Sequence, residues 1–204
     1  GHNENLIGKA LADRRDRYFL ATKMGIVVEG PNRGIDCSPE AIRRCIDESL
    51  QRLKTDHVDL YYMHRFDPKV PVADMAGTMG ELIAAGKIGS YGVSEWSAAH
   101  IREAHAVTPM AAVQTEYSLW TRNPEIAVLD TCRELGITFV AFSPVGRGVL
   151  ANGGKLSLGE LVRLRVRYFS DGLVLGSKEF VEEVYSENRD KFGPRRKSGA
   201  RRMG

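Results

Sequence analysis

The fold is decided by residues 58–65, which read Val-Asp-Leu-Tyr-Tyr-Met-His-Arg. The stretch is apolar and aromatic until its last two residues, as is typical of a short buried strand with a polar end. A helical pattern ends just before it, and another begins at Val72. Strands that alternate with helices build a parallel sheet, whose functional residues gather at the carboxyl ends of the strands. His64, which ends this strand, is therefore the first candidate for a functional residue.

Four other stretches have the same form, a short apolar run that closes on a polar residue. They are residues 18–23, 88–94, 110–114 and 137–143. The five predicted strands end, in order, on Lys23, His64, Ser94, Gln114 and Ser143. Each of these could equally be an ordinary solvated or hydrogen-bonded residue at a strand end. Their shared position favours a single site at one rim of a barrel.

Helical patterns separate the predicted strands. Asn3 is predicted to cap a first helix that carries Leu6, Ile7 and Leu11 on one face. A cap, a proline and an acid at Ser38-Pro39-Glu40 predict a strong second helix start. Further helices are predicted over residues 72–85, from residue 97, and over residues 123–136. Residues 30–34 are interpreted as a loop, and no β-hairpin turn is recognised, so all the connections are expected to be crossovers.

Composition is typical of one soluble globular domain with a core of its own. The chain has 204 residues, of which 43% are hydrophobic and 27% charged, ordinary values for a globular protein. No apolar run approaches the ~18 residues of a membrane span, so no membrane partner is expected. Cys37, Cys45 and Cys132 are few and widely spaced, which favours a reducing, cytoplasmic compartment and argues against a disulfide framework or a metal site.

The net charge of +3 is unevenly distributed. Residues 155–204 hold 12 Lys/Arg and 7 Asp/Glu, a net +5, and residues 1–154 hold the other 17 and 19, a net −2. This shift predicts a domain boundary near Gly153-Gly154. The basic end at Arg195–Arg202 is interpreted as a solvated tail, with a nucleic-acid contact as the alternative.

Several segments together resemble the aldo-keto reductases, in the order and at the strand ends where that family has them. They are residues 1–8, 20–23 (LATK), 59–65 (DLYYMHR), 92–94 (GVS), 113–120 (VQTEYSLW) and 141–148 (AFSPVGRG). The resemblance covers residues 1 to about 150 and implies NADPH-dependent reduction of small-molecule aldehydes or ketones. The implied fold is α/β: a partial (β/α)8 TIM barrel of about five parallel strands over residues 1–152, with a helical basic extension over residues 153–204.

The resemblance also implies roles for individual residues. Lys23 and His64 match two members of a catalytic Asp-Tyr-Lys-His tetrad, in which the lysine charge assists an acid tyrosine and the histidine orients the carbonyl. The remaining site residues are expected to bind the cofactor: Ser94 and Gln114 at the nicotinamide amide, Phe142 on the ring, and Ser143, Val145 and Gly146 at the pyrophosphate.

The sequence departs from the family at three places. The family's catalytic aspartate and tyrosine lie just before a segment like residues 1–4, so the 204 residues are expected to lack both and to be inactive as a truncated chain. Glu95 stands where the family often has asparagine. After Gly148 nothing resembles the segment that binds the cofactor's 2′-phosphate.

Residues 156–204 resemble instead the C-terminal end of transposases associated with repetitive extragenic elements. That resemblance implies a composite chain. It leaves two alternatives to the reductase: a nucleic-acid-binding fragment that acts through the basic C-terminal segment, and a structural remnant without activity. The oligomeric state is left open.

Overall fold

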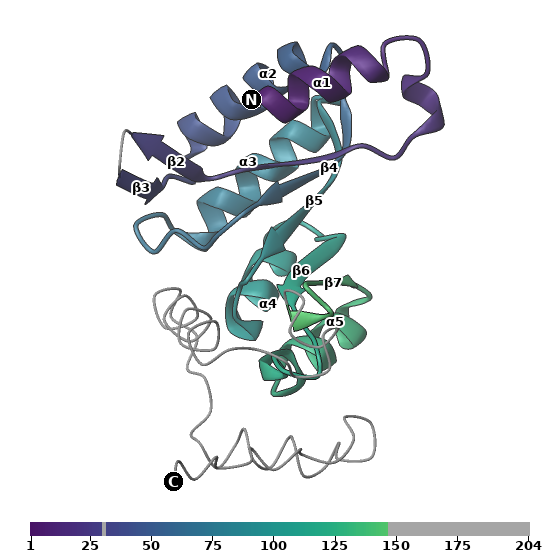
Figure 1. Ribbon diagram of the computed structural model, residues 1–204. Coiled ribbons are helices and arrows are strands. Elements are labelled where there is room, and N and C mark those ends of the chain that lie inside the picture. The colour runs from purple at the N-terminus through teal and green to yellow at the C-terminus, as the bar shows by residue number, and fades with distance from the viewer. Residues whose placement is uncertain (30–31, 147–204) are drawn as a thin grey trace, which may run out of the picture. The chain divides into compact units, whose positions relative to one another are not determined.

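The computed structural model describes residues 1–29 and 32–146 (Figure 1). The chain divides into two compact units, residues 1–116 with 123–142 and residues 117–122 with 143–204, and each is described by itself. The predicted boundary near Gly153, the helical extension and the basic segment Arg195–Arg202 lie outside the described residues.

The first unit is built on a five-stranded sheet in the order β1-β4-β5-β6-β7. The strands are β1 (Ala21–Met24), β4 (Val58–Met63), β5 (Ile88–Ser94), β6 (Ala112–Glu116) and β7 (Thr138–Phe142). All four pairings between neighbouring strands are parallel. The predicted α/β fold with five parallel strands is confirmed.

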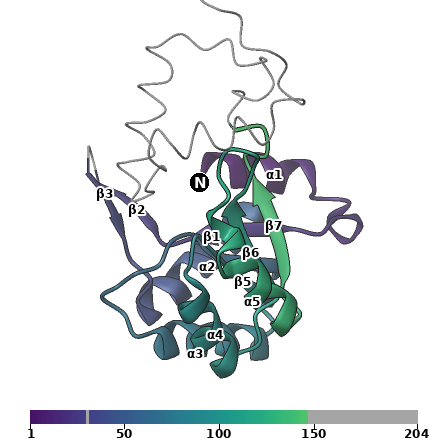
Figure 2. The same cartoon turned by 90° about the horizontal axis from the view of Figure 1, so that it is seen from below.

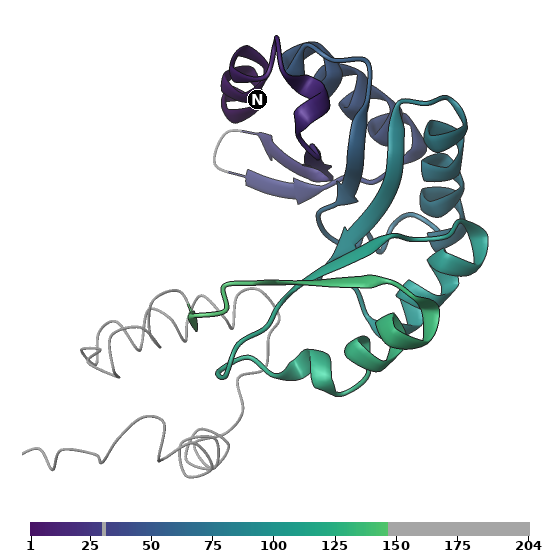
Figure 3. The same cartoon turned by 90° about the vertical axis from the view of Figure 1, so that its right-hand side faces the viewer.

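Helices connect consecutive strands and lie along one face of the sheet (Figure 3). They are α2 (Pro39–Leu53), α3 (Val72–Ala84), α4 (Ala98–Val107) and α5 (Val128–Leu135), and two 3-10 turns cover Arg15–Arg17 and Asn123–Glu125. Two predicted helix starts are confirmed, since Ser38 accepts a hydrogen bond from the Ala41 N–H and Ser97 accepts one from the His100 N–H. The helix predicted over residues 123–136 begins later, at Val128, because Asn123–Glu125 forms a 3-10 turn. Among the helices of the described residues, none combines the length and apolar character needed to cross a bilayer.

The two faces of the sheet differ in what covers them. Tyr61, Met63, Val93 and Val113 point toward the helices and join the main hydrophobic core. Side chains alternate along a strand, so their neighbours Leu60, Tyr62 and Ala112 point the other way and form a smaller cluster with Val140. We call this second surface the inner face.

The segment after β1 is a β-hairpin, which the sequence analysis had interpreted as a loop. Strands β2 (Ile26–Glu29) and β3 (Asn32–Ile35) pair antiparallel and project from the five-stranded sheet (Figures 1 and 2). The β-branched run Ile26-Val27-Val28 favours a strand. The prediction of crossovers alone was wrong here because Gly30-Pro31 and Gly34 were all assigned to one loop.

The first helix, α1 (His2–Ala10), also differs from the prediction. Asn3 lies inside the helix, and the cap position is Gly1, which makes no side-chain capping bond. Leu6 and Ile7 are exposed, whereas Gly8 is buried. A Cβ on Gly8 would lie 2.5 Å from the Arg52 carbonyl oxygen, so backbone proximity to α2, and not an apolar stripe, sets this packing.

Several strand boundaries are shifted from those predicted. Strand β1 ends one residue beyond Lys23, and β4 and β7 end one residue before His64 and Ser143. Strand β1 begins at Ala21, because the backbone before it is held by side chains: Arg15 donates to the Tyr18 carbonyl, and Asp59 accepts from the Leu20 N–H. Strand β6 runs two residues beyond Gln114, and its last residue is the buried Glu116.

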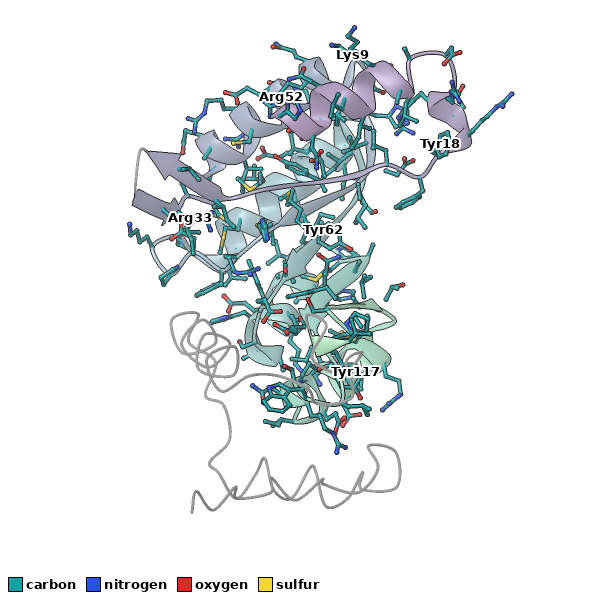
Figure 4. The ribbon with its side chains drawn as sticks, in the orientation of Figure 1. Lys9, Tyr18, Arg33, Arg52, Tyr62 and Tyr117 are labelled. Carbon is teal, nitrogen blue, oxygen red and sulfur yellow. The ribbon has the colours of Figure 1, made fainter. Side chains whose placement is uncertain are left out.

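A carboxylate joins α1 to α2 and β1. Glu4 accepts hydrogen bonds from the Thr22 hydroxyl and from Arg52 Nε, each at 2.6 Å (Arg52 is labelled in Figure 4). Burial alone would raise the pKa of Glu4, but these hydrogen bonds outweigh it and hold the pKa below its ordinary value. The ionised form therefore stabilises the fold.

We expect Glu4→Gln to lower the free energy of unfolding by about 1 kcal/mol at pH 7, as measured by urea denaturation. A lowered folded-state pKa gives stability above the unfolded pKa that is lost as the pH falls through the folded value. The difference between wild type and variant should therefore shrink at acidic pH. Glu48→Gln is the control, since this exposed partner of Arg52 contributes little. A difference that does not change with pH would contradict the assignment.

Candidate active site

Four of the predicted site residues share the inner face near the carboxyl ends of the strands. In the sheet register, Lys23 pairs with Tyr62, which pairs with Gly92, and Ser94 pairs with Gln114. Partners in a parallel ladder point to the same side, and alternation adds His64, which lies two residues beyond Tyr62. The His64 N–H donates to the Met24 carbonyl at 2.9 Å and thereby extends the ladder.

Lys23 lies on the inner face over an aromatic ring. Its Nζ is 5.4 Å from the centre of the Tyr62 ring. The Lys23 side chain is solvent-exposed, and partial desolvation, followed by the positive charge of Arg65, lowers its pKa below the ordinary value. Lys23 and Arg65 are therefore close enough for their positive charges to repel each other.

His64 is held neutral. Burial, and then the charges of Arg65 and Lys23, lower the pKa of the imidazole to about 4. At neutral pH the ring carries one donor and one acceptor nitrogen, so it can hydrogen-bond to an uncharged oxygen without adding charge to the site.

Ser94 and Gln114 lie side by side on neighbouring strands. Ser94 is buried, and its hydroxyl accepts a hydrogen bond from Arg65 Nη1 at 3.3 Å. Gln114 is half-buried, and its main-chain carbonyl accepts from the Glu95 N–H at 3.1 Å, so this bond leaves the side-chain carboxamide unused. A hydroxyl next to a carboxamide offers a donor and an acceptor in one place.

Glu95 spans the gap between the ends of β5 and β6. It has a left-handed backbone with φ of 60°, and its Oε1 accepts from the Glu116 N–H at 2.7 Å. The Glu95 carboxylate thus binds the backbone of the next strand. This contact could not be predicted from the replacement of the family's usual asparagine by glutamate.

The remaining predicted residues lie at the end of β7 or directly after it. Phe142 ends that strand, is half-buried, and pairs with Glu116 in the register, which puts it on the inner face. Ser143, Val145 and Gly146 belong to the second unit. There Ser143 and Gly146 have left-handed φ values of 51° and 55°, and the Gly146 N–H donates to the Ser143 carbonyl at 2.8 Å. This turn uses the Gly146 N–H internally.

Three side chains at this edge of the sheet were not predicted from the sequence. Arg65 contacts Ser94, Glu116 ends β6, and buried Asp67 accepts hydrogen bonds from the Cys37 and Lys69 N–H groups at 3.0 Å each. Their polar character directly after apolar runs was the available signal. The partners Ser94, Glu95 and Cys37 are more than 20 residues away in the sequence, so these contacts carried no local pattern.

The histidines outside the predicted site have structural partners of their own. His100 stacks on Phe66 with ring centres 4.0 Å apart, and His105 Nδ1 accepts from the Met110 N–H at 3.0 Å. His57 contacts Asp56 at an exposed position. None of these three enters the inner-face arrangement.

Known proteins are similar to this chain in sequence and in fold. An aldo-keto reductase named str7 from Strobilurus tenacellus is 48% identical over 155 residues, which cover 74% of this chain and 45% of that protein. The chain spans about half the length of the curated relatives it matches. Residues 1–159 match the sequence profile of the aldo/keto reductase family.

Solved structures agree with the sequence comparison. The holo form of aldo-keto reductase AKR11C1 from Bacillus halodurans has a TM-score of 0.66 at 34% identity, over 72% of this chain and 50% of that one. An aldo/keto reductase from Klebsiella pneumoniae, in complex with NADP and acetate, has a TM-score of 0.61 at 28% identity, over 74% and 51% of the two chains. The chain therefore belongs to the aldo/keto reductase family.

Proposed function

We propose that the protein takes part in the reduction of a small-molecule aldehyde or ketone to an alcohol, with NADPH as the cofactor. The observation that carries this proposal is the inner-face arrangement, in which Lys23 and His64 stand beside the paired Ser94 and Gln114. Family membership and the NADP complex of the Klebsiella pneumoniae relative support the same reaction class.

The two proposed catalytic residues have separate tasks. His64, neutral at physiological pH, donates a hydrogen bond that orients the substrate carbonyl. Lys23 places a positive charge near the carbonyl oxygen, where negative charge develops as the bond order falls. The lowered pKa of His64 keeps the imidazole from adding a third full charge beside Arg65 and Lys23.

The residues at the strand ends fit a nicotinamide cofactor, which supplies the hydride when bound. A carboxamide needs one donor and one acceptor, and Ser94 and Gln114 present both from adjacent strands. The half-buried Phe142 ring can cover an aromatic face. Ser143 and the Val145 N–H are proposed to meet the pyrophosphate, and Gly146 shapes that turn through its left-handed backbone.

The proton for the product alcohol is not assigned to any tyrosine of the sheet. Tyr61 and Tyr91 point toward the helices, and burial raises the pKa of both. Tyr62 reaches the inner face, but burial raises its pKa as well. We therefore propose that these 204 residues, assayed alone, turn over slowly, since a positioned general acid contributes about 10²–10⁴-fold in rate.

A reducing, cytoplasmic location is proposed from the cysteines. Cys37, Cys45 and Cys132 are all free thiols. Burial, followed by the nearby acids, raises the pKa of Cys37 to about 12, so this thiol stays protonated and unreactive.

The proposal is tested by fluorescence titration of the 204-residue chain with NADPH. We expect saturable binding that Ser94→Ala weakens about tenfold, the equivalent of one hydrogen bond of ~1.4 kcal/mol. Ser90→Ala is the matched control: Ser90 lies on the same strand and face, but its hydroxyl donates to the Asp59 carbonyl, away from the strand end. Unsaturable binding, or equal affinity in the two variants, would argue against the proposed cofactor site.

A further inference from the structure

Arg65 lies at the edge of the inner face and contacts both a proposed catalytic residue and a proposed cofactor ligand. Its Nη1 lies 2.7 Å from the His64 carbonyl oxygen and 3.3 Å from the Ser94 hydroxyl oxygen. These contacts link the loop after β4 to the last residue of β5.

The loop that carries Arg65 is itself held in place. The Arg65 carbonyl accepts from the Cys37 thiol at 3.6 Å, and Asp67, two residues on, accepts from the Cys37 N–H at 3.0 Å. Both Cys37 and Asp67 are buried. The guanidinium therefore extends from a fixed backbone, and its direction is set before any ligand arrives.

The hydrogen bond between Arg65 and Ser94 can be donated in only one direction, from the guanidinium to the hydroxyl. A guanidinium has no acceptor, so in this pair the serine oxygen must accept. One lone pair of Ser94 is thereby used, and its own hydroxyl hydrogen must point away from Arg65. We propose that Arg65 is a positioning residue that fixes Ser94 as a hydrogen-bond donor toward a ligand carbonyl, such as that of a nicotinamide carboxamide.

The same side chain has an electrostatic effect on its neighbours. The charge of Arg65 acts on His64 and on Lys23, in each case in the direction that disfavours a further positive charge. Lys23 on β1 acts on His64 in the same sense, and the acids Glu95 and Glu116 lie at the ends of β5 and β6. Removing Arg65 would remove one of the positive charges that lower the pKa of His64, whereas the effect of burial on that pKa would remain.

Two measurements on the cofactor-free chain test this inference. The first is an NMR titration of His64. Arg65→Met is expected to raise its titration midpoint on the order of 0.5 pH unit, and Arg65→Lys to keep it at the wild-type value. A role in packing alone would not separate the two variants by charge. A wild-type midpoint in Arg65→Met would show that the guanidinium does not lie near His64, and would overturn the placement of Arg65 on which the proposal stands.

The second measurement follows the Arg65 guanidinium and does not need an Arg65 variant to fold. Ser94→Ala removes the oxygen that Nη1 contacts, so rotation about the Arg65 Cζ–Nε bond, read from its Nη signals, should become faster. Ser90→Ala should leave it unchanged. Unaltered Nη signals in Ser94→Ala would overturn the contact on which the inference stands.

The cofactor side of the inference rests on the proposed function and is tested separately. Arg65→Met should weaken NADPH binding about threefold to tenfold in the wild-type background and cause no further loss in Ser94→Ala. Additive losses would show that Arg65 does not act through Ser94. A wild-type chain that binds no NADPH would contradict the proposed function. The His64 titration and the Arg65 guanidinium signals would still test the positioning role of Arg65, because neither needs the cofactor.

Discussion

Gly92→Ala is expected to lower the free energy of unfolding by about 3 kcal/mol, one of the two largest effects of any single substitution considered. Gly92 lies in the middle of β5, where it pairs with Tyr62 on one side and Ala112 on the other. A Cβ there would lie 2.6 Å from both the Ala112 carbonyl oxygen and Tyr62 Cε1. Neither can retreat freely, because one is backbone in the sheet and the other belongs to a buried ring.

The substitution should also disturb the site. The Tyr62 ring that fills the space above Gly92 is the ring over which Lys23 Nζ stands. Displacing it would move the surface that supports the lysine. The expected readout is a lower urea midpoint together with changed NMR signals at Lys23.

Gly77→Ala provides the control for Gly92→Ala. Gly77 lies inside α3, and a Cβ there meets no atom within 4 Å. Alanine is the better helix former by about 0.5–1 kcal/mol, so this variant should be neutral or slightly more stable. Equal destabilisation in the two variants would show that glycine flexibility, and not the space at Gly92, governs the result.

The sheet was predictable because its signal is repeated and local. Each parallel strand is a short apolar run, and a capping residue such as Ser38 or Ser97 marks the start of the helix that follows. The β2–β3 hairpin lacked such redundancy. Its three β-branched residues form a single short run, and Val28, which is 61% exposed, does not pack into the hydrophobic core.

The site was predictable in part for the same reason. Strand-end residues such as Lys23, His64 and Ser94 are recognised by their position in a repeated pattern. Arg65 and Asp67 are different, because what they do depends on partners 29 and 30 residues away in the sequence. Such contacts follow from the register between strands and from the path of loops, neither of which a single sequence displays.

Asp67→Ala is expected to cost about 3 kcal/mol in the free energy of unfolding. Asp67 is 2% exposed, and its two oxygens accept from the Cys37 and Lys69 N–H groups. Alanine would leave the buried Cys37 N–H without its acceptor, and each lost bond to a charged group contributes roughly 1.5–3 kcal/mol. Asp47→Ala is the matched control, because its ion pair with Lys87 is solvent-exposed and contributes at most ~1 kcal/mol.

The same change should reach the proposed active site through the backbone. Asp67 fixes Cys37, whose thiol in turn donates to the Arg65 carbonyl, so the loop that follows His64 loses its anchor when the carboxylate is removed. We therefore expect Asp67→Ala to shift the His64 titration in the same direction as Arg65→Met, upward, because the guanidinium is no longer held beside the imidazole. An Asp67→Ala chain that is destabilised, yet titrates His64 at the wild-type pH, would show that Arg65 holds its position without this support.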